Sequence, residues 1–421
     1  MPLPSLAVFR HRAFTRFWLG RVMAVLAMEM QTTAIGWQVY DAARADGKSV
    51  AEAALILGFM GLAQFGPLLL LSLVGGRAAD RYDRKSILLL CYLAKAAIAI
   101  GLALSAGLTG DALIMVILAA SLGAGALRAF MPAANTALLP TLVPREDLPR
   151  AVAWGALGFQ GGIVVGPALG GLLYALGPVT PYASAAALFL VSLGLLTITE
   201  TPKRDVLPPA QGASMIFEGL KFVWSNKLVL GAISLDLVVG FFAGAIALLP
   251  VFARDILYAG PAELGILRSA MGAGACVVAL VIAVAPIRRN VGRWMFASTV
   301  VFGLATLAFG VSQSLWLSVG ALAIAGGADI VSVFIRQTLI QMATPDAMRG
   351  RVGAVSMLCI SASNELGDFE AGLVARFVGP MAAVVFGAGA AIAASAAWWR
   401  LFPSLARADD FDTRIGDDRE Q

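Results

Sequence analysis

The sequence predicts an all-α membrane protein in which twelve transmembrane helices form two pseudo-symmetric halves of six. Hydrophobic residues make up 59% of the 421 residues and charged residues only 14%, against about 25% in an ordinary soluble domain. The mean hydropathy is +0.83, and apolar residues extend along the whole chain. Lipid is therefore the main solvent, and the spans must be helices because open strands would leave backbone groups unpaired in a bilayer.

Twelve runs have the roughly 20 mainly apolar residues that a transmembrane helix needs. In the first half they cover residues 17–39, 53–75, 86–106, 112–134, 152–176 and 182–199. In the second half they cover residues 228–252, 264–286, 294–311, 315–342, 352–374 and 381–402. The first run contains Arg21, Glu29 and Gln31, so we expect it to be a permanent span and not a cleaved signal peptide.

The basic residues fall mainly on one side of the predicted membrane. With the N-terminus placed in the cytoplasm, 22 of the 31 lysines and arginines lie in termini and loops on that side. Only four, Arg44, Lys48, Arg254 and Arg376, lie in loops on the other side. Because cytoplasmic loops carry an excess of Lys and Arg, we expect a multi-pass protein in the lipid bilayer of the inner (plasma) membrane, with both termini in the cytoplasm.

Residue types that support enzymatic or metal chemistry are scarce. The chain has one histidine, His11, and three cysteines, Cys91, Cys276 and Cys359, each in a different apolar stretch. These residues do not form a metal-ligand pattern, and the cysteines are expected to be free and buried. No G-x-x-x-x-G-K-[ST] motif for nucleotide binding occurs. We therefore expect no metal, no cofactor, no enzyme activity and no nucleic-acid partner.

The longest interruption between spans divides the chain. It contains three prolines and then an amphipathic stretch at 216–224, which predicts a linker with a helix on the membrane surface. The predicted units are an N-terminal six-helix half at 1–199, a cytoplasmic linker at 200–227, a C-terminal six-helix half at 228–402 and a polar cytoplasmic tail at 403–421. Similar short segments at 135–138 and 337–340 favour duplicated halves, an arrangement found in transporters.

The loop between spans two and three carries a recognisable motif, Gly75-Gly76-Arg77-Ala78-Ala79-Asp80-Arg81-Tyr82-Asp83-Arg84-Lys85. It resembles the G-x-x-x-D-R-x-G-R-[RK] signature of the major facilitator superfamily at Gly76, Asp80, Arg81, Arg84 and Lys85, with Asp83 in place of the second glycine. Gly76 is expected to let two helices approach closely. The resemblance implies a conformational latch that holds the two halves in one access state. The alternative is that the arginines only determine topology.

A second motif lies in span five, at residues 162–171. It resembles the G-x-x-x-G-P-x-x-G-G motif of drug-exporting facilitators at Gly162, Gly166, Pro167, Gly170 and Gly171. Small residues four positions apart form a groove for close helix packing, and a proline bends the helix. The resemblance implies an antiporter-type element that favours efflux; the alternative is a packing element alone.

Further similar segments, at 30–37, 137–144, 249–252 and 265–268, extend the resemblance over nearly the whole chain. Together they resemble the branch of the superfamily that contains the enterobactin exporter and other secretion permeases. The superfamily fold implies a central cavity lined by spans one, four, seven and ten, with spans two, five, eight and eleven beside them. The motifs do not identify the substrate, because relatives that share them can move different compounds.

Several charged residues fall inside the predicted spans, where a charge costs roughly 2.5–3.5 kcal/mol on insertion scales and marks a functional hypothesis. The candidates for coupling or substrate binding are Glu29, Arg128, Asp236, Asp329, Arg336, Glu365 and Asp368. Arg21, Arg268 and Glu370 also lie in spans, and Lys95, on a peripheral span, is expected to reach the membrane surface or form a structural pair. An aromatic cavity wall is a further expectation for Phe130, Phe241, Phe242 and Phe334.

Helical spacing groups some of these charges. Asp329 and Arg336 share a helix face, as do Glu365 and Asp368, whereas Glu370 points elsewhere. We hypothesise that the five candidate carboxyl groups include the proton-coupling group, because closure of a cavity favours the protonated form and a nearby arginine favours the ionised form. The alternative is a set of buried ion pairs, such as Asp329 with Arg128 or Arg336, that hold the bundle in register.

The predicted function is secondary active export of a small organic molecule, siderophore-like or amphipathic, by proton antiport. The protein is expected to act as a monomer. An importer or uniporter of a small metabolite with the same fold is the alternative, and sodium is the alternative coupling ion. A membrane enzyme or sensor is disfavoured, since the sequence has no nucleophile–base pair and no appended soluble domain.

Overall fold

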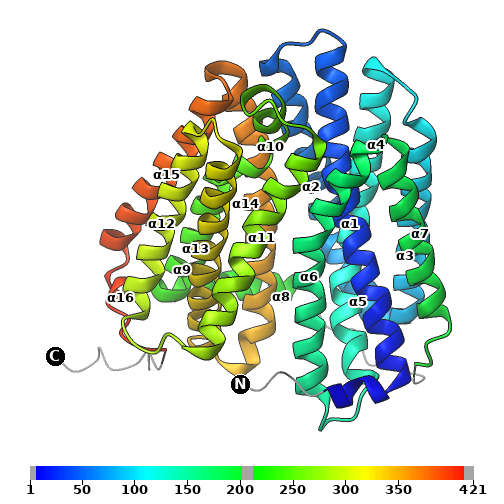
Figure 1. The fold of residues 1–421 in the computed structure, drawn as a ribbon. Coiled ribbons are helices and arrows are strands. Elements are labelled where there is room, and N and C mark those ends of the chain that lie inside the picture. Colours follow the sequence, from blue (N-terminus) through cyan, green and yellow to red (C-terminus); the bar gives the residue numbers. More distant parts are fainter. Residues whose placement is uncertain (1–5, 202–211, 412–421) are drawn as a thin grey trace, which may run out of the picture.

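The structure, a computed structural model, describes residues 6–201 and 212–411. These residues form helices joined by short loops, as the sequence predicts (Figure 1). The N-terminal half contains α1 (Arg12–Ala45), α2 (Val50–Arg81), α3 (Arg84–Ser105), α4 (Gly110–Arg128), α5 (Met131–Leu138), α6 (Leu148–Ala175) and α7 (Val179–Thr197). The C-terminal half contains α9 (Lys227–Phe242), α10 (Leu249–Val251), α11 (Pro261–Val284), α12 (Val291–Val311), α13 (Leu315–Met342), α14 (Asp346–Val378), α15 (Pro380–Leu401) and α16 (Pro403–Ala406).

Ten helical stretches in the described ranges are long and apolar enough to cross a membrane. Two more long helices, α1 with 34 residues and α14 with 33, run beside them (Figure 1). Their charged residues lower their hydropathy, because Glu29 lies in α1 and Glu365, Asp368 and Glu370 lie in α14. With these two helices, the predicted twelve-helix fold class is confirmed.

Two spans that the sequence predicts as continuous helices are interrupted. In the fourth span α4 ends at Arg128 and α5 begins at Met131. Pro132 has no N–H to donate to the carbonyl of Arg128 four residues earlier, and its ring disfavours helical geometry just before it. In the seventh span α9 ends at Phe242 and the chain continues through a 3-10 turn, η3 (Gly244–Ile246), into α10.

Two helix pairs carry most of the contact between the halves, α2 with α14 and α6 with α11. Glycines allow the close approach: a Cβ atom added at Gly372 of α14 would lie 2.9 Å from the Cα of Gly58 in α2. Small residues at such crossings are what lets membrane helices gain packing energy. The two halves therefore meet along the whole middle of the molecule.

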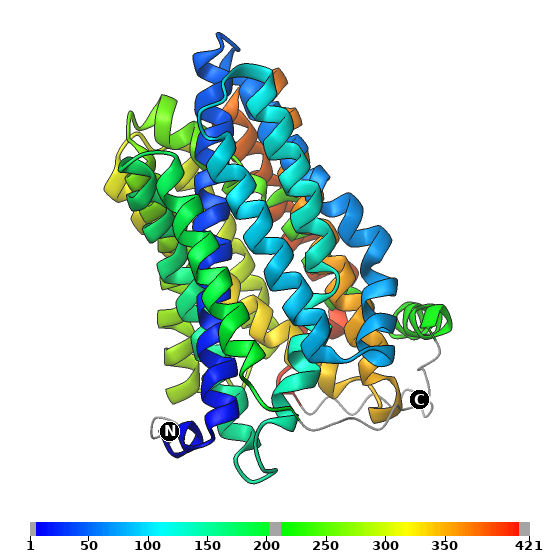
Figure 2. The ribbon, with the colours of Figure 1, turned by 90° about the vertical axis from the view of Figure 1, so that its right-hand side faces the viewer.

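The amphipathic segment before the seventh span forms α8 (Gly212–Ser225). Figure 2 looks along this helix at the edge of the bundle near its base, so α8 lies across the direction of the spans. Its Glu218 carboxylate pairs with Arg351 of α14. The helix is thus attached to the C-terminal half by an ion pair.

Candidate functional site

A cavity of about 350 Å³ lies between the two halves. This volume is at the low end of the roughly 300–1,000 Å³ of small-molecule sites. Six charged side chains, from five helices of both halves, contribute to its lining: Glu29, Lys95, Arg128, Arg268, Glu365 and Asp368. The cavity therefore combines three cationic and three acidic groups at one place between the halves.

An ion pair crosses this cavity from one half to the other. Arg128, the last residue of α4, pairs through its Nη1 with Oε1 of Glu365 in α14. The Glu365 side chain is only 9% exposed, so removing its partner would leave a buried charge, which is strongly destabilising. Because Arg128 and Glu365 belong to different halves, relative movement of the halves must stretch or break this pair.

Close packing against glycines fixes the positions of two more acidic residues of the cavity, Glu29 and Asp368. A Cβ atom added at Gly166 of α6 would lie 2.5 Å from the Cβ of Glu29, and one added at Gly61 of α2 would lie 3.0 Å from the Cβ of Asp368. Larger residues at these glycines would push the carboxylates away from their present positions. Gly166 belongs to the glycine motif of span five, which links that motif to the charged cavity.

Some buried polar atoms of the cavity lining have no hydrogen-bond partner among the described residues. They are Oε1 of Gln31, Oγ of Ser121 and Nε of Arg268. Buried polar groups in proteins are nearly always hydrogen-bonded. These three atoms are therefore available to a polar ligand.

A second charged cluster lies inside the C-terminal half. Nη2 of Arg336 in α13 is 2.6 Å from Oδ1 of Asp236 in α9. Arg336 pairs with Asp236 in this structure and not with Asp329, and Arg128 pairs with Glu365. None of Asp236, Asp329 and Arg336 is among the residues that line the central cavity.

In the loop motif the closely packed glycine is Gly75 and not Gly76, for which close packing was expected. A Cβ atom added at Gly75 would lie 2.1 Å from the carbonyl oxygen of Ala129, at the break after α4, whereas Gly76 faces open space. Asp83 is the N-cap of α3 and accepts a hydrogen bond from the N–H of Ser86 at 2.9 Å. An aspartate therefore serves this turn well where the family pattern has glycine.

The basic residues of the loop motif bind helix ends within the N-terminal half. Arg84 donates to the carbonyl of Ala137 at 2.7 Å. Lys85 donates to the carbonyls of Thr197 and Thr199 at 2.9 and 2.7 Å, at the end of α7. Cations at helix C-termini satisfy free carbonyls and the helix dipole. Arg81 is exposed beside the Tyr82 ring, and the side chain of Asp80 lies outside the described part of the molecule.

The glycine motif of span five packs α6 against two partners. Added Cβ atoms at Gly162 and Gly170 would lie 2.5 Å from Cγ1 of Val25 and 2.6 Å from the carbonyl oxygen of Met30, both in α1. At Gly171 an added Cβ atom would lie 2.2 Å from the carbonyl oxygen of Pro261 in α11. The motif thus holds α6 against its own half and against the other half at once, with Pro167 inside the helix.

Lys95 does not reach the membrane surface, which is the first of the two alternatives expected for it: it is 3% exposed and lines the cavity. The aromatic wall expected from Phe130, Phe241, Phe242 and Phe334 is absent from the cavity lining, which contains Phe159 instead. Arg268, which is not among the residues predicted for coupling or substrate binding, also lines the cavity. Its charge within the apolar run of span eight is the sequence signal that could have identified it.

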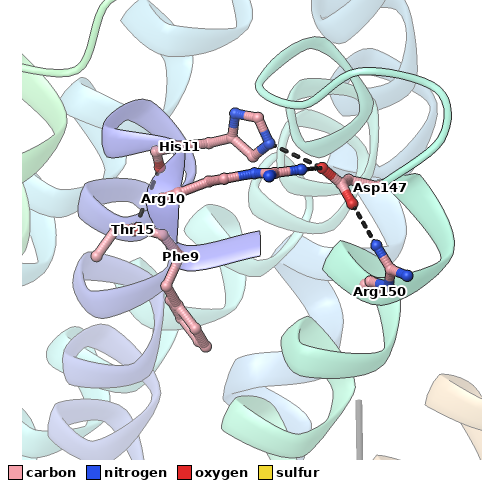
Figure 3. Close-up of polar contacts among 6 residues, drawn as sticks. All are labelled: Phe9, Arg10, His11, Thr15, Asp147 and Arg150. Carbon is pink, nitrogen blue, oxygen red and sulfur yellow. Dashed lines mark hydrogen bonds and ion pairs between the residues drawn. The ribbon is translucent and has the colours of Figure 1, made fainter. Parts of the chain in front are cut away.

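An acid–base cluster ties the N-terminal segment to the start of α6 (Figure 3). The Asp147 carboxylate lies 2.9 Å from Nε2 of His11, 3.2 Å from Nη2 of Arg10 and 2.7 Å from Nη1 of Arg150. Hydrogen bonds from His11, Arg150 and Arg10 lower the pKa of Asp147 to about 2. The cluster lies in the loop before α6, outside the spans.

A known protein family matches nearly the whole chain. A model of the transmembrane secretion effector family matches residues 3–414. The chain belongs to this family. It is therefore a multi-pass membrane transporter of the major facilitator superfamily, and transport, not catalysis, is the activity of that superfamily.

Among characterised relatives, the enterobactin exporter EntS of Shigella boydii is 30% identical over 371 residues, 85% of this chain and 83% of that protein. The enterobactin exporter EntS of Citrobacter koseri is 32% identical over the same coverage. Solved structures with the same fold include a D-xylose–proton symporter, with TM-score 0.70, 14% identity and coverage of 94% and 98% of the two chains. A bacterial homologue of the iron transporter ferroportin in an inward-facing state has TM-score 0.68, 17% identity and coverage of 96% and 99%.

Proposed function

We propose that this protein exports a small organic molecule, siderophore-like or amphipathic, across the inner membrane in exchange for protons. The observation that carries the proposal is the ion pair between Arg128 and Glu365, which joins the two halves across the central cavity. The names of the curated relatives, enterobactin exporters, support the direction and the class of substrate. The excess of basic residues at the end with both termini supports a cytoplasmic location for that end.

The cavity provides a mechanism for exchange. A proton that reaches Glu365 removes its charge and frees Arg128, and an anionic group of the substrate can compete for the same guanidinium. Proton and substrate would then bind in alternation, since each weakens the contact that the other needs. Lys95 and Arg268 add positive charge, and the unpaired polar atoms of Gln31 and Ser121 add hydrogen-bonding capacity.

The two sequence motifs have separate roles in this proposal. In the state that the structure describes, Arg84 and Lys85 bind carbonyls of the N-terminal half. We assign Gly76, Asp80, Arg81, Arg84 and Lys85 to a latch that engages the C-terminal half only in the opposite access state. The glycine motif of α6 serves as the packed surface on which α1 and α11 move, and it keeps Glu29 in the cavity.

The test is transport by wild-type protein and by Glu365→Gln, with Glu370→Gln as matched control. Glu370 lies on the same helix and does not line the cavity. We expect protonophore-sensitive efflux of a catecholate siderophore or a fluorescent amphipathic cation from cells that lack their own exporters. Glu365→Gln should lower efflux about tenfold or more, which corresponds to only about 1.4 kcal/mol, and should make the remainder independent of the pH gradient.

Three outcomes would contradict the proposal. Equal efflux by wild type, Glu365→Gln and Glu370→Gln, at equal amounts in the membrane, would exclude coupling through the ion pair. Proton-driven or facilitated accumulation of a metabolite, without efflux of either test compound, would favour the importer or uniporter. Efflux that follows a sodium gradient and ignores a protonophore would identify sodium as the coupling ion.

A further inference from the structure

A second concave site lies at the base of the C-terminal half, at the ends of α12 and α15 and beside α16 (Figure 1). Its volume is about 650 Å³. Three arginines line it, Arg293 from the first turn of α12, Arg400 from the last turn of α15 and Arg407 after α16. None of the three forms an ion pair with a side chain in the ranges 6–201 and 212–411, and all three are exposed. We call this site the arginine basin.

Hydrogen bonds donated by backbone N–H groups at the start of α12 fix the floor of the basin. The N–H of Gly292 donates to the carbonyl of Ala408 at 2.9 Å, and the N–H of Asn290 donates to Oδ1 of Asp409 at 3.2 Å. An added Cβ atom at Gly292 would lie 2.2 Å from the carbonyl oxygen of Leu405, which is fully buried. Asp409 is the acidic residue of the lining and stands against three arginines, so the lining keeps an excess of positive charge.

An apolar groove of about 380 Å³ continues from the basin along the outer face of α12 and α15. It shares Arg293 and Trp399 with the basin, and its other lining residues are Phe296, Ala297, Val300, Ser395 and Ala396. The Trp399 ring packs edge-on against Phe296 with 5.2 Å between centroids. Tryptophan favours the boundary between headgroups and acyl chains, so basin and groove lie on either side of that boundary.

We propose that the arginine basin binds the phosphate-bearing headgroup of an anionic phospholipid and that the groove holds one of its acyl chains. Basic pockets between transmembrane helices bind such headgroups. A free phosphate ion would satisfy the arginines but leaves the adjoining apolar groove without an occupant. The continuity of the two sites therefore selects a lipid over a soluble anion.

The test uses the full-length purified protein in detergent, with native mass spectrometry to count bound phosphatidylglycerol and phosphatidylcholine. We expect wild type to retain phosphatidylglycerol preferentially. Arg293→Gln and Arg407→Gln should each weaken retention about fivefold, as about 1 kcal/mol per basic residue implies. Arg145→Gln, an exposed arginine of the N-terminal half outside the basin, is the matched control and should change nothing.

The groove and the ligand's source are tested separately. Ala396→Phe fills the groove and leaves every arginine in place, so it should reduce lipid retention while inorganic phosphate has no effect on it. Release of the lipid by millimolar inorganic phosphate, together with unchanged retention in Ala396→Phe, would overturn the lipid assignment in favour of a free anion. Equal retention by Arg293→Gln, Arg407→Gln and Arg145→Gln would overturn the site itself. Thermal unfolding of each variant without added lipid shows whether it is folded.

Discussion

Asp147 binds Arg10 and His11 of the N-terminal segment and Arg150 of α6. Its pKa of about 2 in the folded protein lies below the roughly 3.9 of an unfolded chain. Stability from its ionised form is therefore fully present above about pH 4 and is lost as the pH falls towards 2. We expect Asp147→Asn to lower the thermal unfolding midpoint at neutral pH, and the difference from wild type to shrink below about pH 4.

The measurement compares Asp147→Asn with its wild-type background by thermal unfolding in detergent between pH 8 and pH 3. Glu146→Gln is the matched control, since Glu146 is the exposed neighbour. A difference between Asp147→Asn and its background that persists undiminished to pH 3 would show that the carboxylate's charge does not stabilise the protein. A change of the same size in Glu146→Gln would show that the effect is not specific to the cluster.

Several cavity residues were predictable one by one. Glu29, Arg128, Glu365 and Asp368 stand out because a charge in an apolar run is expensive, and the structure brings all four to the cavity. Their pairing was not predictable, because the partner of Arg128 is 237 positions away along the chain. The position of Lys95 was not predicted, because the third span was assigned to the periphery from its place in the order of spans. One face of that helix nevertheless faces the cavity.

At the scale of the element, Gly171 decides how closely α6 and α11 approach. A methyl group there would lie 2.2 Å from the carbonyl oxygen of Pro261, which belongs to the backbone and cannot rotate away. We expect Gly171→Ala to destabilise the protein by about 1–3 kcal/mol, as overpacking does, and to lower transport. Gly161→Ala, in the same helix but facing open space, should leave both unchanged or raise stability slightly.

Thermal unfolding and efflux, measured on both variants at equal membrane levels, check this prediction. Wild-type behaviour of Gly171→Ala would mean that α6 and α11 separate easily in the working protein. Equal losses in both variants would point to a general intolerance of α6 for alanine and not to the close contact.

Helix periodicity and hydropathy located the elements well, and local backbone chemistry explains where they failed. The interruptions after Arg128 and Phe242 were not predicted, because Pro132 and the glycines around 240–244 had to be interpreted as breaks inside apolar runs. Hydropathy alone cannot reveal such breaks, because the residues before and after each break are equally apolar and equally stable in lipid. The break after α4 matters for function, since it places Arg128 at a helix end facing the cavity.

At the scale of the whole molecule, the halves are joined at the end away from the termini. Nη1 of Arg254 is 3.0 Å from Oδ1 of Asp41, and Nη2 of Arg44 is 3.4 Å from Oδ1 of Asp255. Tyr40 also donates to Asp255. At the opposite end, no ion pair connects the two halves in the described ranges 6–201 and 212–411. This asymmetry is typical of one access state of an alternating transporter, with the ion pairs closing the end away from the termini.

The closed end should therefore open when its ion pairs are removed. Asp255→Asn removes the charge that Arg44 and Tyr40 contact. A partly exposed ion pair contributes about 1 kcal/mol. Its loss should therefore shift the ratio of the two access states about fivefold. The measurement is the distance distribution between spin labels at two exposed positions of the end away from the termini, 108 in the N-terminal half and 258 in the C-terminal half, in a cysteine-free background. Asp111→Asn is the matched control, because Asp111 pairs with Lys48 inside one half. A long-distance population that grows in Asp255→Asn and stays unchanged in Asp111→Asn would establish the ion pairs between the halves as the contact that closes this end. Equal distributions in both variants would assign closure to helix packing alone.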